Sequence, residues 1–75
     1  MQIFVTRLHA AVTMAFDVEP NDTIFKVKAL VEAVTGAESD YFVLVWRDNA
    51  CSMHRTLASY NIVESCTLQM VYVDY

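Results

Sequence analysis

The sequence predicts an α+β domain in which one helix crosses a small mixed β-sheet. Three observations predict it: apolar residues alternate with period two over residues 1–8 and again over 12–18, a central segment has helical spacing, and alternation returns near the end. At 75 residues the chain has room for one domain, which we place at 1–75. A hydrophobic content of 56% against 19% charged residues excludes intrinsic disorder.

The first two elements are strands joined by a short turn. Over residues 1–8, alternate apolar residues such as Ile3 and Val5 share one face, which is typical of a half-buried strand. Residues 12–18 alternate in the same way. Residues 9–11 are predicted as the turn between them, although they lack the Gly or Asn that hairpin turns prefer.

The helix has a start signal and a stop signal. Residues 19–22 contain the only proline and break the second strand. Thr23 is suited to cap the helix, because its hydroxyl can accept a hydrogen bond from the exposed N–H groups of the first turn. An apolar stripe predicts a helix over 24–35, and Gly36 is free to take the left-handed conformation that ends it.

The second half of the chain contains two further strands. Residues 41–46 form a continuous apolar run of strand length, and residues 67–73 alternate as a last strand. Between them we predict a turn at 47–49, an irregular stretch as far as Arg55, and a short helical turn over 56–60. This order of elements is the β-grasp arrangement, in which the helix packs on one face of the sheet and the other face stays exposed.

The same periodicities assign one continuous core. It combines the inner positions of each strand, the stripe of the helix and a few apolar loop residues. The predicted core consists of Ile3, Val5, Met14, Phe16, Val18, Ile24, Val27, Val31, Phe42, Leu44, Cys51, Leu57, Ile62, Leu68 and Met70.

Particular residues narrow the choice among small α+β folds to one family. They match that family's sequence in one continuous alignment along nearly the whole chain, apart from one extra residue in the first hairpin turn. They are MQIFV at the start with Leu8 after it, VEPxDTI from Val18, VKA from Val27, Gly36, RTLxxYNI from Arg55, and TL from Thr67. These segments resemble the matching segments of ubiquitin, so the chain is identified as a diverged member of the ubiquitin family, and a ubiquitin-like β-grasp fold is implied.

Departures from the family pattern bear on activity. Ubiquitin is conjugated through a flexible tail ending in two glycines, since only a tail without side chains threads the channels of the activating and cleaving enzymes. Here residues 71–75 are VYVDY, and Val43 and Val73 match arginines that dock on the activating enzyme. Of the family's acceptor lysines, only the one matching Lys28 is kept. We therefore expect a domain that is neither conjugated nor chain-building.

One binding feature of the family persists. Its members are recognised through a shallow apolar patch on the open sheet face, and the resemblance places Leu8, Val45 and Val71 there, with Gln69 replacing the usual histidine. An exposed apolar patch suggests a protein-binding surface. The alternative is that diverged strands keep β-branched residues only for their sheet propensity.

Residues that suggest chemistry are isolated. Cys51, Cys66 and His54 have no partner at the close spacing of a zinc site, and the register places Cys51 where the family has a buried leucine. We therefore predict no catalytic site, no metal site and no cofactor, and no enzymatic activity. Trp46 and Tyr60 match family aromatics and are interpreted as structural, with the Tyr60 hydroxyl tying down its own loop.

Charge and composition limit the partners. The net charge is −4 and the five basic residues are scattered, which argues against direct nucleic-acid binding. No apolar run approaches the roughly 20 residues of a membrane span, so we expect no membrane insertion. Two cysteines and no secretory signal favour the cytoplasm. We expect a monomer with protein partners.

Two functions remain open. We favour an uncleaved N-terminal head of a small-subunit ribosomal protein, which would aid the folding and solubility of its basic fusion partner. That preference depends on the organisation of fusion genes in the family. The alternative is an interaction module of a larger protein that binds the proteasome or ubiquitin receptors through Leu8, Val45 and Val71.

Overall fold

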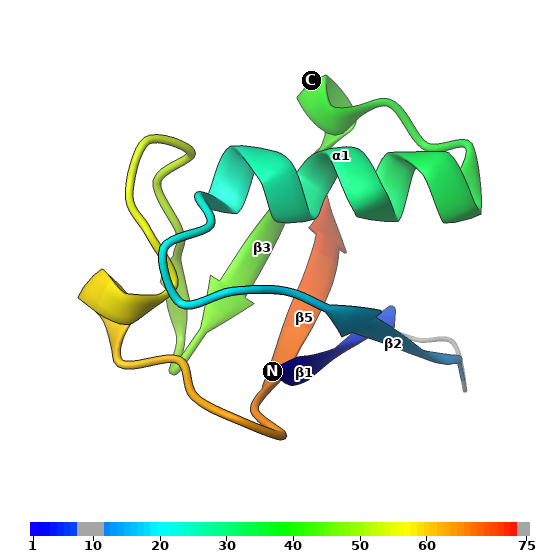
Figure 1. Ribbon diagram of the computed structural model, residues 1–75. Coiled ribbons are helices and arrows are strands. Elements are labelled where there is room, and N and C mark those ends of the chain that lie inside the picture. Colours follow the sequence, from blue (N-terminus) through cyan, green and yellow to red (C-terminus); the bar gives the residue numbers. More distant parts are fainter. Residues whose placement is uncertain (8–11, 74–75) are drawn as a thin grey trace.

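The computed structural model describes residues 1–7 and 12–73. Within them, five strands form one mixed sheet in the order β2-β1-β5-β3-β4, and helix α1 (Ile24–Thr35) crosses one face of it (Figure 1). The predicted α+β fold of the β-grasp type is confirmed. The predicted turn at 9–11 lies outside the described residues.

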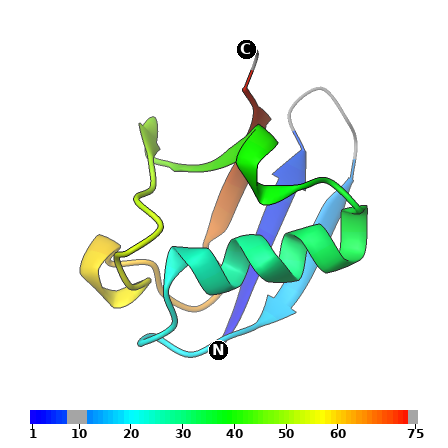
Figure 2. The same ribbon diagram turned by 90° about the horizontal axis from the view of Figure 1, so that it is seen from above.

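Each strand of the sheet pairs with its neighbours in that order. β1 (Gln2–Arg7) pairs antiparallel with β2 (Thr13–Asp17) and parallel with β5 (Thr67–Tyr72). β5 pairs antiparallel with β3 (Phe42–Trp46), which pairs in turn with the short strand β4 (Asn49–Ala50). Because parallel neighbours cannot be joined by a tight turn, the chain crosses the sheet before β5 returns beside β1. Figure 2 shows α1 lying across the strands during that crossing.

Both predicted ends of the helix are confirmed. The side chain of Thr23 accepts a hydrogen bond from the backbone N–H of Lys26 at 3.3 Å. At the other end, Gly36 has a φ of +76°, and its N–H donates to the carbonyl of Glu32 at 2.8 Å. The helix begins and ends where its capping residues satisfy backbone groups that would lack intrahelical partners.

The prediction of an irregular stretch after the third strand was wrong at its start. Asn49–Ala50 forms β4, because Arg47 and Asp48 both take positive φ, 52° and 66°. That conformation is the two-residue turn whose twist suits a hairpin, and it forms here without the Gly by which it is usually identified. The structure also has two short 3₁₀ turns. One spans Ser39–Tyr41, where a connection was predicted up to residue 40 and a strand from Tyr41, and the other spans Ala58–Tyr60, within the predicted helical turn.

The core lies between α1 and the inner face of the sheet. Its buried apolar residues are the predicted set, residue for residue. They include Cys51, which is 8% exposed and therefore packs as a small apolar side chain. One polar residue, Lys28, is also buried, and the sequence analysis did not place it there.

Candidate functional site

The sheet face opposite α1 carries the contact residues predicted from the sequence. Val45 on β3 lies directly opposite Gln69 on β5, and Val43 lies opposite Val71 on the same two strands. The three valines are half-buried and Gln69 is exposed. The structure therefore brings Val45, Gln69 and Val71 together, while Leu8 lies outside the described residues.

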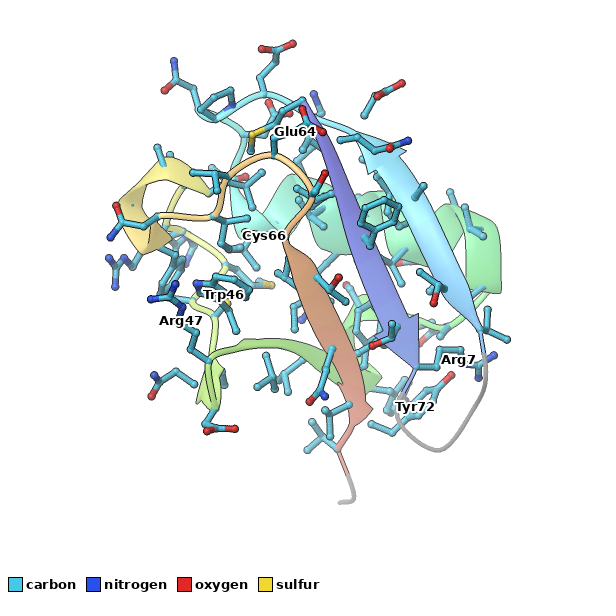
Figure 3. All side chains as sticks on the ribbon, turned by 90° about the horizontal axis from the view of Figure 1, so that it is seen from below. Arg7, Trp46, Arg47, Glu64, Cys66 and Tyr72 are labelled. Atoms are coloured by element: carbon cyan, nitrogen blue, oxygen red, sulfur yellow. The ribbon has the colours of Figure 1, made fainter. Side chains whose placement is uncertain are left out.

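These residues belong to a larger surface, which we call the open face. Successive side chains of a strand point to opposite faces of the sheet. The strand residues that alternate with the buried ones therefore point to the open face. Figure 3 views the sheet from this side. Among the described residues the open face consists of Gln2, Phe4, Thr6, Thr13, Ala15, Asp17, Val43, Val45, Ala50, Thr67, Gln69 and Val71.

The open face is nearly free of charge. Within that set Asp17 is the only residue with an ionisable side chain, and it lies on the outer strand β2. A shallow depression of about 290 Å³ borders Val45 and Gln69 and extends to Arg47 in the β3–β4 turn. The surface thus offers apolar contact and hydrogen bonding from neutral groups, with no arrangement for proton transfer or nucleophilic attack.

The aromatic residues beside the open face have structural roles, as predicted. The indole Nε1 of Trp46 donates to the backbone carbonyl of Tyr60 at 3.2 Å. The hydroxyl of Tyr60 accepts a hydrogen bond from the backbone N–H of Ser52 at 2.7 Å. These two bonds tie the β3–β4 hairpin to the loop that follows it.

Lys28, which the resemblance matches to an acceptor lysine of the family, is only 6% exposed. Its Nζ lies 3.7 Å from the Sδ of Met53 and 5.2 Å from the ring centre of Phe42. Burial lowers the pKa of this lysine, although the charge of Asp40 opposes that effect. Its burial could have been found in the sequence, since Lys28 is spaced four residues after Ile24 and three before Val31, on the apolar stripe.

The cysteines offer no catalytic centre in the described structure. Both are free thiols, and burial raises the pKa of Cys51, so it is not the thiolate that nucleophilic chemistry needs. Cys66 accepts a hydrogen bond from the backbone N–H of Val63 at 3.4 Å. Within residues 1–7 and 12–73, no group of three His, Cys, Asp or Glu residues is arranged to hold a metal ion.

The same residues contain no helix that is both long and apolar enough to cross a bilayer.

The chain is similar in sequence to one known family. A sequence model of the ubiquitin family matches residues 3–72. The match includes α1, all but the first residue of the five strands, and the Val45, Gln69 and Val71 group. With the fold and the family match in agreement along the described chain, this protein belongs to the ubiquitin family.

Proposed function

We propose that this domain works by binding other proteins through its open face and that it catalyses no reaction. Domains of the ubiquitin family are generally not enzymes. The observation that carries the proposal is the half-buried valine group, Val43, Val45 and Val71, on the sheet face opposite the helix. Apolar side chains left partly exposed on adjoining strands supply the favourable burial that drives association.

The partners proposed are ubiquitin receptors, including those of the proteasome. Because the open face has no basic side chain in the described set, apolar burial and neutral hydrogen bonds would carry the affinity. Binding should then change little between low and physiological salt, since screening acts on charged contacts.

The proposal is tested with a purified helical ubiquitin-receptor domain and the intact chain, by isothermal titration calorimetry. Val45→Asp buries a charge in the contact and should weaken binding by at least about tenfold. Val63→Asp is the matched control, because Val63 is 60% exposed and lies outside the open face. Circular dichroism melting of each variant confirms that it is folded. The proposal would be contradicted if the intact domain failed to bind the receptor domain, or if both variants lost the same amount of affinity.

A second candidate function is supported by the charge of the chain. We propose, as that candidate, that the domain stays attached as the N-terminal head of a small-subunit ribosomal protein. The chain has a net charge of −4, opposite in sign to a basic ribosomal partner, and its core closes without help from another chain. An acidic head of this kind would keep a basic partner soluble before assembly.

The second candidate is tested in the organism that makes the protein. The coding sequence beyond Tyr75 should continue into a lysine-rich segment. An antibody against the domain should detect a larger protein that sediments with the small ribosomal subunit in the cytoplasm. A domain found only as a free 8.5-kDa species would overturn this candidate and leave the first one standing.

A further inference from the structure

A second surface lies at the edge of the sheet, between the β3–β4 hairpin and the Ala58–Tyr60 turn. It is a depression of about 440 Å³, and its lining includes Trp46, Arg47, Asn49, Arg55, Ser59 and Tyr60. Figure 3 shows Trp46 and Arg47 at this edge, beside the 3₁₀ turn and away from Arg7 and Tyr72. We call it the arginine pocket.

Two arginines are held in the pocket by aromatic rings. The Cζ of Arg47 lies 5.1 Å from the ring centre of Trp46, and the Cζ of Arg55 lies 4.1 Å from that of Tyr60. The two rings are themselves joined, since the indole of Trp46 donates to the Tyr60 carbonyl. The guanidinium groups are thus positioned before any ligand arrives, which lowers the entropy lost on binding.

Among residues 1–7 and 12–73, no carboxylate forms an ion pair with either arginine. Within the described residues, the one ion pair joins Lys26 and Asp22, far along the chain from the pocket. Arg55 donates only to neutral acceptors, the hydroxyl and the carbonyl oxygen of Ser59, at 3.1 Å and 2.9 Å. Stacking on a ring occupies the flat face of a guanidinium and leaves N–H donors at its edge for an anion.

The arginine pocket contains a large share of the few basic residues in this chain. The chain has five basic residues and a net charge of −4, yet two of the five converge on a single pocket. Because both arginines line this one depression, an anion bound there gains attraction from two positive charges.

We propose that the arginine pocket binds a carboxylate-bearing segment of a protein partner, an acidic peptide rich in Glu or Asp. The planar fork of arginine matches the two oxygens of a carboxylate, and the uncovered part of the half-buried Trp46 indole beside it packs against the aliphatic stem of the peptide's side chain. A nucleic acid fits less well, because two cations neutralise few phosphates. The valine group does not line the arginine pocket, although Trp46 and Arg47 border both depressions.

The chain contains its own probe, because Trp46 is the only tryptophan. A synthetic polyglutamate peptide is titrated against the intact protein at low salt while the indole fluorescence is followed. A saturable change is expected, weakening at physiological ionic strength as charged contacts are screened. A polyglutamine peptide of equal length should give no saturable change.

Three substitutions assign the effect to the pocket. Arg47→Gln and Arg55→Gln should each weaken peptide binding about tenfold, the cost of one charge-assisted contact. Arg47 makes no described side-chain hydrogen bond, so its variant should fold even if loss of the Ser59 contacts unfolds the Arg55 variant. Arg7→Gln is the matched control, since Arg7 also stacks on a ring, that of Tyr72, at 5.5 Å but lies outside the pocket.

The Arg7 variant should bind within about twofold of the parent, since screening leaves little interaction between distant charges. Equal weakening in the Arg7 and Arg47 variants would show a general charge effect and overturn the proposal. So would the absence of any saturable change with the acidic peptide. An oligouridylate that binds more tightly than the acidic peptide, and whose binding is lost in the Arg47 and Arg55 variants, would overturn the assignment to a peptide and point to nucleic acid.

Discussion

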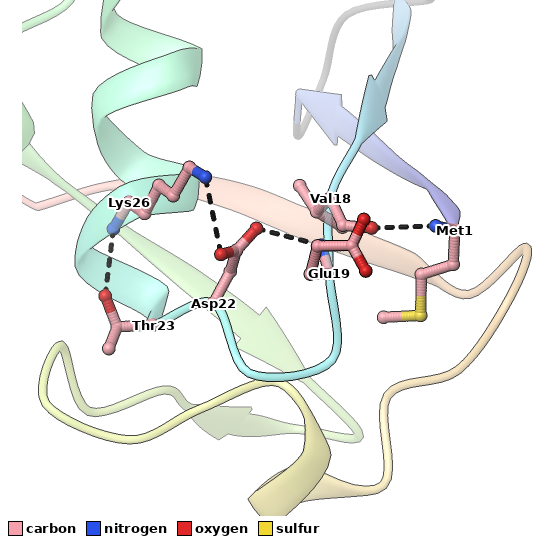
Figure 4. A network of polar contacts seen from close by, with 6 residues as sticks. All are labelled: Met1, Val18, Glu19, Asp22, Thr23 and Lys26. Carbon is pink, nitrogen blue, oxygen red and sulfur yellow. Dashed lines mark hydrogen bonds and ion pairs between the residues drawn. The ribbon is translucent and has the colours of Figure 1, made fainter.

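A single carboxylate organises the chain where it enters the helix. Figure 4 shows Asp22 between the backbone of Glu19 and the side chain of Lys26. Its Oδ2 accepts from the Glu19 N–H at 2.8 Å, and its Oδ1 lies 3.3 Å from the Lys26 Nζ. The backbone hydrogen bond is the main cause of the lowered pKa of Asp22, and Lys26 adds to it. Asp22 therefore holds the turn best when it is ionised.

That lowered pKa predicts how stability changes with acid. The pKa in the folded state lies below the unfolded value of about 3.9, so the stabilising contribution is present above about pH 4. It is lost as the pH falls through the lowered pKa. Urea unfolding of Asp22→Asn should show lower stability than the parent at neutral pH, and the gap should close near pH 2. Lys26→Met keeps the hydrogen bond between Asp22 and the Glu19 N–H, so it should lower stability at neutral pH less than Asp22→Asn does. A stability difference between Asp22→Asn and the parent that persists near pH 2 would refute this explanation.

Lys28 shows how one buried residue affects chemical access. Its Nζ packs against Met53 and Phe42, whereas the side chain of Lys26 is 57% exposed. An amine must be accessible and unprotonated to be acylated. The match of Lys28 to an acceptor lysine of the family stays a prediction, and the burial of Lys28 makes local opening a requirement for acylation there.

We expect a water-soluble acetylating reagent to modify Lys26 at least about tenfold faster than Lys28 in the folded domain. Mass spectrometry of peptides taken at successive times measures both rates. In urea the two rates should converge, because unfolding removes the protection of Lys28. Equal rates in the native protein would mean that the Nζ of Lys28 is accessible.

At the scale of elements, the ends of α1 are specified locally. Thr23 caps its start and Gly36 ends it at a φ of +76°. A Cβ added at Gly36 would meet no atom within 4 Å, so any cost of a side chain there comes from backbone conformation alone. The helix length is therefore set by two residues whose preferences do not depend on packing.

Gly36→Ala should lower the free energy of unfolding by about 1–2 kcal/mol, the cost of a left-handed alanine. Gly36→Asn should lose less, because asparagine tolerates that conformation better. Chemical denaturation measures both variants. Equal losses for alanine and asparagine would indicate that something other than φ limits this position.

At the scale of the whole molecule, the ubiquitin fold is kept without its basic docking residues. Val43 is half-buried opposite Val71, and Val73 donates its backbone N–H to the carbonyl of Tyr41 at 2.9 Å. The resemblance places arginines of the family at Val43 and Val73. Valine can fill these positions in the sheet but cannot make charge-assisted contacts with an activating enzyme.

We therefore expect the protein to be a poor substrate for ubiquitin-activating enzyme. Two lost charge-assisted contacts predict activation at least about a hundredfold weaker than that of ubiquitin in the same assay. Incubation with the enzyme and ATP, followed by non-reducing electrophoresis, measures the thioester. A thioester formed as readily as with ubiquitin and released by a reducing agent would overturn the inference of non-conjugation.

The sequence by itself determined the four longer strands, the helix with both caps, the buried apolar set and the family. These features follow from local periodicity, from capping chemistry and from the preference of apolar side chains for the interior. The tertiary structure alone decided that Arg47 and Asp48 make a hairpin with β4, and that Arg47 and Arg55 meet at one pocket. Such pairings depend on turn conformation and on neighbours distant in the chain, which residue spacing does not encode. In the sequence the five basic residues are scattered, and only the fold brings two of them to one pocket, where neither forms an ion pair with a described residue.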